Sequence, residues 1–307
     1  MIPWLLTLFT KEYAPRQAML IVCLSSALWG VLWVPMRYLE AAGLTGLWVV
    51  VLFHLLPTLT MLPFMGGMRT LSRQDWAKIC LAGVLMGAGF ALYAVGLVLA
   101  SVTKTVVLFY MTPIWSTIIG YFVLGERAGA ARWIAIMAAL AGCAMISGVT
   151  DTIFVLDPLD SFGLLSGLFW AMGSVAIRRF DGVNFTHVTF LQYLFGGILA
   201  LIAAVLLVVP VPDIAVWMDT IPLAFVASAM IFLPTVLLLF RIMQYISPGL
   251  VGILMLSEAL VAALSAAYFL GERLDPAQWL GAGLILATGV FVGIIESRRS
   301  PSDKLAL

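Results

Sequence analysis

The sequence predicts an all-α membrane protein with ten transmembrane helices in two inverted five-helix repeats and both termini in the cytoplasm. Three observations predict this fold class: an apolar composition, a series of long hydrophobic runs, and motifs that recur in both halves of the chain. Of the 307 residues, 63% are hydrophobic and only 10% are charged, against ~25% charged in ordinary soluble domains. So few charges could not cover the surface of a soluble protein of this size.

The composition also excludes several classes of protein. The net charge of +1 lacks the basic excess of a nucleic-acid binder, so we expect no nucleic-acid partner. The cysteines Cys23, Cys80 and Cys143 lie singly in apolar runs, without disulfide or metal-ligand spacing, and we expect neither a metal nor a cofactor. Residues 1–10 contain no Lys or Arg, unlike the start of a signal peptide. We interpret them as an interfacial segment; an unusual targeting segment is the alternative.

A bilayer core of ~30 Å requires about 20 apolar residues of helix, and ten apolar runs of about this length recur along the chain, of which the fifth, sixth and tenth are shorter. They are longer than the ~10-residue strands of a membrane barrel and are apolar on all sides, whereas such strands alternate. The expected spans are residues 19–38, 47–65, 79–100, 105–124, 133–149, 162–177, 188–209, 221–240, 250–270 and 279–295.

The basic residues indicate the orientation of these spans, because cytoplasmic loops carry an excess of Lys and Arg. With the N-terminus inside, 13 of the 16 basic residues fall on the cytoplasmic side, and only Arg37, Lys104 and Arg273 fall outside. Reversing the topology or removing one span spoils this separation. The basic residues therefore support ten crossings independently of hydropathy.

Two motifs recur in the halves of the chain. A Gly-Glu-Arg sequence at residues 125–127 is repeated 146 residues later at 271–273, each time between two apolar runs. Trp29, followed after eight residues by Arg, recurs as Trp170, also followed after eight residues by Arg. Since five spans is an odd number, the second copy enters the membrane from the opposite side. Inverted repeats of this kind are typical of secondary transporters, whose substrate site lies near the midplane between the halves.

The repeats divide the chain into five parts, with no soluble domain. We expect an N-terminal cytoplasmic or interfacial segment, a first repeat, an external linker, a second repeat and a cytoplasmic tail. Their boundaries are residues 1–17, 18–149, 150–159, 160–296 and 297–307.

The order of these motifs resembles the drug/metabolite transporter superfamily, in its EamA-type branch. The matching residues are Trp29-Gly30 with Arg37, Pro113, Leu124-Gly125-Glu126, Ser257-Glu258-Ala259 and Leu270-Gly271-Glu272. The resemblance covers about residues 18–296; Pro35 and Met36 depart from it, because the family more often has small residues there. It implies a carrier of small metabolites that works by alternating access without ATP, in a bacterial cytoplasmic membrane. The branch includes exporters of amino acids and related compounds.

Glu258 is the first candidate for function. Most charges lie at the ends of the expected spans, but Glu258 lies about eight residues into the run 250–270. An ionisable side chain at membrane depth is costly and is therefore a functional candidate. A carboxyl group there can take up a proton or hold a substrate ammonium group, so we assign it to substrate binding and proton coupling. The alternative is a protonated carboxyl group that hydrogen-bonds a neighbouring helix.

His54 and Gln192 occupy corresponding positions in the second and seventh spans. Polar side chains at matched positions of an inverted repeat are expected to face each other across a central cavity, and a neutral His can relay protons. We therefore predict that both bind substrate and that His54 also takes part in proton coupling. The alternative is that each joins neighbouring helices by a hydrogen bond.

Five aromatic residues are candidates for the wall of a binding pocket. Trp29 and Trp33 are four residues apart and share a helical face, Trp170 is the counterpart of Trp29, and Tyr93 and Tyr110 lie in the third and fourth spans. Such rings can hold a cation or another aromatic ring. The alternative is that they are lipid-facing or interfacial anchors.

The repeated Gly-Glu-Arg sequences lie at the ends of spans. There Glu126 with Arg127, and Glu272 with Arg273, can pair locally and cap the turn, so we predict a structural or gating role for them instead of substrate contact. Pro113 falls within the fourth span, where proline frees a backbone carbonyl and allows a bend. We include it among the gating candidates.

The sequence lacks the residues of an enzyme site. Catalysis needs paired carboxylates, a metal-binding His set or a nucleophile with its base, whereas the chain has two histidines and one midplane carboxylate. It also has no Gly-rich phosphate loop with a Lys. We therefore expect a secondary transporter and not an enzyme. A channel or sensor without coupled transport is the alternative.

One acidic group among aromatic residues fits an amino acid, an amine or a quaternary ammonium compound. It fits a nucleoside or sugar less well, because few amide and hydroxyl side chains lie at depth; export of nucleosides or drug-like compounds is the alternative. The expected partners are a small-molecule substrate, protons and membrane lipid. Monomer and homodimer are both compatible with the sequence.

Overall fold

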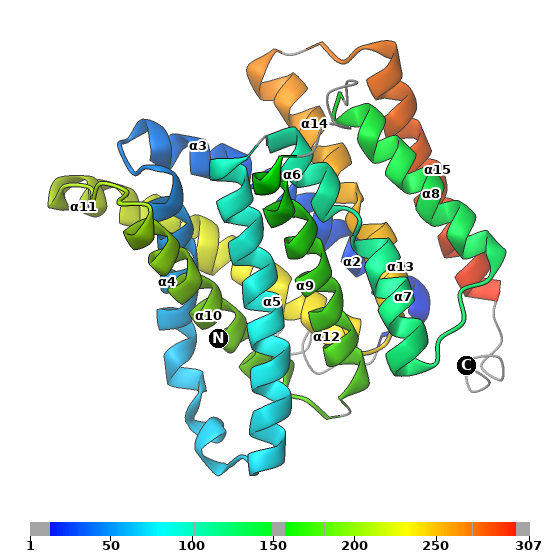
Figure 1. Cartoon of the computed structure of the whole chain (residues 1–307), viewed down its shortest axis with the longest axis horizontal. Coiled ribbons are helices and arrows are strands. Elements are labelled where there is room, and N and C mark those ends of the chain that lie inside the picture. The colour runs from blue at the N-terminus through cyan, green and yellow to red at the C-terminus, as the bar shows by residue number, and fades with distance from the viewer. Residues whose placement is uncertain (1–12, 101, 149–156, 181, 272, 299–307) are drawn as a thin grey trace.

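The computed structural model describes residues 13–100, 102–148, 157–180, 182–271 and 273–298. In these residues every regular element is a helix, and the predicted all-helical fold is confirmed (Figure 1). Within the described residues, nine helical segments are long and apolar enough to cross a bilayer, and a tenth apolar helix has 17 residues. Glu272, most of the expected linker and the distal parts of both termini lie outside the described residues.

The first half of the chain contains five apolar segments, two of them interrupted. Their elements are α2 (Pro15–Trp29) with α3 (Trp33–Ala41), α4 (Gly46–Met61), α5 (Arg73–Leu99), α6 (Val102–Phe109) with α7 (Thr112–Leu124), and α8 (Ala130–Ile146). Two short 3₁₀ turns, η1 (Leu62–Phe64) and η2 (Gly66–Thr70), connect α4 to α5. The expected fifth span, residues 133–149, is shifted by three residues, because its helix begins directly after Gly129.

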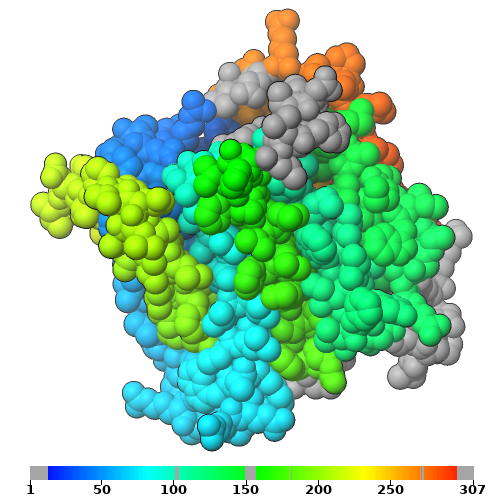
Figure 2. Space-filling model, viewed as in Figure 1, coloured from blue at the N-terminus to red at the C-terminus, as the bar shows by residue number. Residues whose placement is uncertain are grey.

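The second half repeats this plan. Its elements are η4 (Pro158–Asp160), α9 (Ser161–Arg179), α10 (Phe185–Leu206), α11 (Ile214–Phe225) with the π-helical η5 (Val226–Phe232) and α12 (Leu233–Met243), α13 (Pro248–Met255) with α14 (Ser257–Leu270), and α15 (Pro276–Arg298). The eighth span was expected at residues 221–240, but this helical segment is longer and covers Ile214–Met243. Its first part, α11, projects at the edge of the bundle (Figures 1 and 2).

The helix pairings show that the halves are related by a pseudo-two-fold axis. Equivalent helices of the two halves pack against each other: α4 against α10, α7 against α13, and α8 against α15. The contact between α5 and α9 also has its counterpart in the contact between α12 and α2. With five spans in each half, this arrangement is the inverted repeat that the motifs predicted.

Two interrupted spans break at equivalent positions. The fourth span breaks at Tyr110 and Met111, and the ninth breaks at Leu256, which lies 146 residues after Tyr110. In the fourth span Pro113 stands in the first turn of α7, where its missing N–H and fixed φ are tolerated. The breaks leave helix termini, with their unpaired backbone groups, near the middle of the molecule.

The repeated glycines of the Gly-Glu-Arg sequences end their helices in the same way. Gly125, after α7, has φ +73°, and Gly271, after α14, has φ +70°. This left-handed conformation is readily available to glycine and is a common helix C-cap. The repeat therefore preserves a backbone conformation at these two positions.

Glycine also allows α2 and α14 to pack with their backbones in contact. A Cβ atom on Gly30 would lie 2.5 Å from the carbonyl oxygen of Glu258 and 2.8 Å from the backbone nitrogen of Ala262. Ser257 adds a hydrogen bond from its hydroxyl group to the Cys23 carbonyl, at 2.9 Å. The first turn of α14, which carries Glu258, is thus held directly against α2.

Candidate functional site

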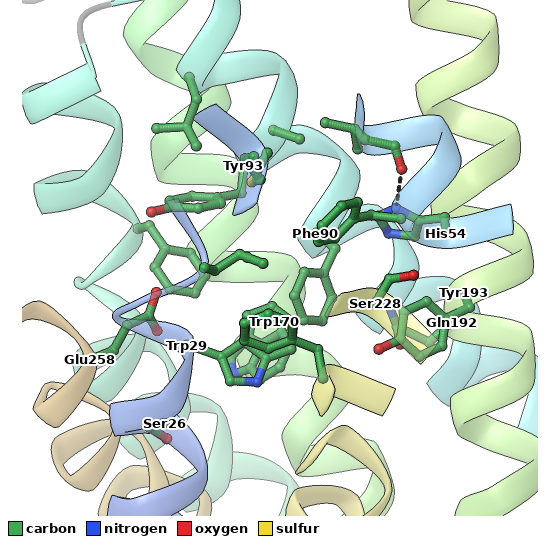
Figure 3. A pocket seen from close by; sticks show the side chains of 18 of the residues that line it. Ser26, Trp29, His54, Phe90, Tyr93, Trp170, Gln192, Tyr193, Ser228 and Glu258 are labelled. Atoms are coloured by element: carbon green, nitrogen blue, oxygen red, sulfur yellow. Dashed lines mark hydrogen bonds between the residues drawn. The ribbon is translucent and has the colours of Figure 1, made fainter. Parts of the chain in front are cut away.

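A cavity of about 120 Å³ lies at the centre of the helix bundle (Figure 3). A single buried water requires only ~10–15 Å³ on the same measure, so the space is large enough for a small organic molecule. Both halves of the chain contribute to its wall. The lining residues are Ser26, Trp29, Leu32, Met36, Val50, Phe53, His54, Phe90, Tyr93, Ala94, Leu97, Phe109, Trp170, Gln192, Tyr193, Ser228, Phe232, Leu239, Met255 and Glu258.

The cavity brings together six of the residues singled out from the sequence. These six are Glu258, Trp29, Trp170, Tyr93, His54 and Gln192. They come from six different spans, so only the folded bundle places them at one site. The structure also adds residues that the sequence analysis missed, of which Phe90, Tyr193, Ser228 and Phe232 form part of the wall.

Two of the predicted pocket residues do not line this cavity. Trp33 lies beyond the break that follows α2, and its indole N–H donates a hydrogen bond to the Ser265 hydroxyl at 2.9 Å. The four-residue spacing from Trp29 predicted a shared face, but the break at residues 30–32 interrupts the helix between them. Tyr110 is buried, with 2% of its surface exposed, but it is not among the residues that line the cavity.

Glu258 lies in the first turn of α14, directly after the break at Leu256. A carboxyl group in this position is near the unpaired N–H groups of a helix N-terminus, which favour negative charge. Ser26 of α2 also lines the cavity, and its hydroxyl group has no hydrogen-bond partner among the described residues. None of the described lining residues is a Lys or Arg. One side of the cavity therefore presents a carboxyl group without a basic partner in the wall.

Aromatic rings form the middle of the wall. The ring of Phe90 packs between those of Trp29 and Trp170, with centroids 5.1 Å and 4.9 Å away. Trp29 also contacts Phe232 of η5, and its indole N–H donates to the Thr235 hydroxyl of α12 at 3.0 Å. These contacts fix the Trp29 ring between the first and eighth spans. Phe90 precedes Tyr93 by one helical turn, which is the signal in the sequence that could have identified it.

The other side of the cavity carries neutral polar groups. The His54 Nδ1 atom lies 2.8 Å from the Val50 carbonyl oxygen, so this nitrogen carries the proton and Nε2 is left as an acceptor. Neither Nε2 nor the Gln192 amide nor the Ser228 hydroxyl has a hydrogen-bond partner among the described residues. His54, Gln192 and Ser228 expose only 6%, 0% and 1% of their surfaces. Figure 3 shows them on the opposite side of the aromatic cluster from Glu258.

The described residues hold no group of three or more His, Cys, Asp or Glu side chains that could bind a metal ion. The described residues of the cavity wall offer one carboxyl group, one imidazole, one amide and the hydroxyl groups of Ser26, Ser228, Tyr93 and Tyr193. Its chemistry is thus that of a binding site for an organic molecule, with hydrogen-bonding groups at two sides and aromatic rings between them.

A model of the EamA-like transporter family matches the chain twice, at residues 16–148 and at 158–294. The chain belongs to the EamA-like transporter family. It is therefore a transporter of small molecules and an integral membrane protein. The resemblance noted from the sequence motifs is confirmed by this match.

The transporter also matches 28 chains of solved structures. One of them, described as "Crystal structure of protein", superposes with a TM-score of 0.71 at 18% sequence identity, over 92% of this chain and 98% of that chain. At this identity the similarity shows a shared fold. No curated protein sequence matches the transporter.

Three gating candidates of this EamA-like transporter follow the ends of α7 and α14 and are not among the residues that line the cavity: Glu126, Arg127 and Arg273. Glu126 lies 4.0 Å from both Arg132 and Arg178, whereas Arg127 and Arg273 are exposed. Glu126 thus forms ion pairs to α8 and α9. Arg178 also donates a hydrogen bond to the Gln244 carbonyl after α12. These contacts join the ends of four spans on one face of the bundle.

Proposed function

We propose that this transporter is a secondary carrier that exports amino acids, or related amine and zwitterionic compounds, across a bacterial cytoplasmic membrane. The observation that carries the proposal is the Glu258 carboxyl group, which belongs to the only acidic side chain among the described residues lining the cavity. A buried charge is retained when it is paired, and a substrate ammonium group supplies the missing partner. Because none of the described residues that line the cavity is a Lys or Arg, a cation fits it better than an anion.

The aromatic wall supports the same class of substrate. The faces of Trp and other rings attract cations, and each such contact contributes about 0.5–2 kcal/mol. Trp29 is held in place by its hydrogen bond to Thr235, so little side-chain entropy is lost when a substrate packs against it. A compound with an ammonium group and an apolar body therefore matches both parts of this wall.

We further propose alternating access with proton exchange. Carriers built from inverted repeats move one repeat against the other around a central site, and the equivalent breaks in the fourth and ninth spans provide places where the helices can bend. The Glu258 carboxyl group can hold a proton or contact a substrate ammonium group. Competition between the proton and the ammonium group for Glu258 would couple substrate movement to the pH gradient. His54 would be a second site able to accept a proton.

Counterflow in proteoliposomes tests the carrier and Glu258 together. We expect labelled tyramine or phenylalanine to be taken up faster when the same unlabelled compound is inside, because a carrier returns faster when loaded. Glu258→Gln removes the charge with little change in shape, so it should lower the affinity for an amine by tenfold or more, about 1.4 kcal/mol, or abolish the dependence of transport on the pH gradient.

The matched control is Glu40→Gln, which removes a carboxylate at the exposed end of α3 and should transport like the wild type. Uptake without trans-acceleration would indicate a channel. Wild-type affinity and an unchanged pH dependence in Glu258→Gln would show that this residue has only a structural role.

A further inference from the structure

We infer that His54, Gln192 and Ser228 form a second subsite, which binds a neutral hydrogen-bonding group at the end of the substrate opposite its ammonium group. The inference rests on the proposed function, in which Glu258 holds the ammonium end. It makes the substrate class more specific: an amine with an apolar or aromatic body and a hydroxyl or amide group at its far end.

The first support is the lack of hydrogen-bond partners. Nearly all buried polar groups in native proteins have such a partner, and an unpaired one costs ~1–3 kcal/mol. Here the His54 Nε2 atom, both polar atoms of the Gln192 amide and the Ser228 hydroxyl lack one among the described residues. All three residues line the same cavity. These four atoms have almost no accessible surface in the empty cavity, so a substrate group that pairs with them must displace the side chains now packed over them.

The second support is the chemistry of these atoms. Because Nδ1 of His54 donates to Val50, Nε2 is an acceptor, while Gln192 and Ser228 each offer both a donor and an acceptor. The set includes no fixed positive charge that would hold a carboxylate. A hydroxyl or amide group, which donates and accepts at once, satisfies such a set.

The third support is the arrangement of the cavity. Trp29, Phe90 and Trp170 lie between Glu258 and the three polar residues (Figure 3). The His54 ring also packs edge-on against Phe90, with centroids 6.3 Å apart. A molecule that reaches both Glu258 and the three polar residues must therefore have an apolar middle part that lies against these aromatic rings. Matched interactions at both ends of such a body would set the length of a preferred substrate.

Binding of hydroxylated and plain amines to the purified full-length protein tests the inference, with tryptophan fluorescence as the measurement. The hydroxylated probes are tyramine and its homologues with one methylene fewer or more, which vary the reach. Each is compared with the analogue that lacks the phenolic hydroxyl group. At the best length, we expect the wild type to bind the hydroxylated amine at least tenfold more tightly than its analogue.

Gln192→Leu and Ser228→Ala should each reduce this preference, measured as the ratio of the two affinities in the same variant, from at least tenfold to about twofold or less. The control is Thr189→Val on the same helix, because the Thr189 hydroxyl already donates to the Phe185 carbonyl at 2.8 Å. This variant should keep the wild-type preference. Two different variants are used so that a folding defect in one does not decide the result.

The possible outcomes separate the two proposals. If plain and hydroxylated amines bind equally at every length, or if the preference survives in both variants, the second subsite is wrong while the amine carrier stands. If neither kind of amine binds, the proposed function is wrong and the inference falls with it.

Discussion

In the proposed second subsite, the buried polar side chain of Gln192 would favour binding at the expense of stability. Its side chain is fully buried in α10, and neither amide atom has a partner among the described residues. A leucine of similar size would remove this unpaired group without opening a large cavity. The cost of the amide is then recovered only when a substrate binds to it.

We therefore expect Gln192→Leu to stabilise the substrate-free protein by about 1 kcal/mol. The measurement is thermal unfolding in detergent without added ligand, with Thr189→Val as the control on the same helix. A lower midpoint for Gln192→Leu than for the wild type would show that the amide has a partner in the folded protein.

Trp29 is expected to bind substrate, whereas its neighbour Trp33 is not. Trp29→Ala should weaken amine binding several-fold, because a cation–π contact is worth about 0.5–2 kcal/mol. Trp33→Ala serves as the comparison, since Trp33 contacts Ser265 and Phe269 instead of the cavity. Affinities measured by isothermal titration would contradict the assignment if both substitutions had the same effect.

At the scale of the elements, the contact between α2 and α14 holds Glu258 in place. Gly30 packs against the backbone at Glu258 and Ala262, and a side chain there could be accommodated only if the two helices separated. Since backbone atoms cannot rotate away as a side chain can, even one extra methyl group should displace the first turn of α14.

We expect Gly30→Ala to destabilise the protein by about 1–3 kcal/mol, the usual cost of overpacking, and to weaken amine binding. The matched control is Gly283→Ala in α15, where no atom lies within 4 Å of the added Cβ and alanine favours the helix. Thermal unfolding of both variants tests this. Equal midpoints would show that α2 and α14 can separate at little cost.

For the whole molecule, the untested prediction is its orientation in the membrane. The distribution of basic residues places the region after the first repeat outside the cell and the η1–η2 turn inside. In a cysteine-free protein, Asp157→Cys should react with an impermeant maleimide added to intact cells. Thr70→Cys should react only after the cells are opened; both positions are exposed. The reverse pattern would overturn the predicted orientation.

The sequence by itself determined the spans, the repeats and much of the cavity wall. Span length and loop charge are local properties, because the insertion of a segment into a bilayer depends on the length and hydrophobicity of that segment itself. The repeat was also readable, since Gly125 and Gly271 must be glycines to end their helices in the same left-handed conformation. Glu258 was identifiable because a charge in an apolar run is rare.

Only the tertiary structure decided which of these residues share the cavity and which polar atoms lack partners. The break after Gly30 turns Trp33 away from Trp29, although their spacing predicts one face. Ser228 gives no sequence signal, because a single serine in a membrane helix usually bonds to its own backbone. Whether its hydroxyl group finds a partner depends on atoms from other helices. A hydrogen bond extends only about 3 Å. The packing between spans, and not the order of residues, therefore decides whether the Ser228 hydroxyl group has a partner.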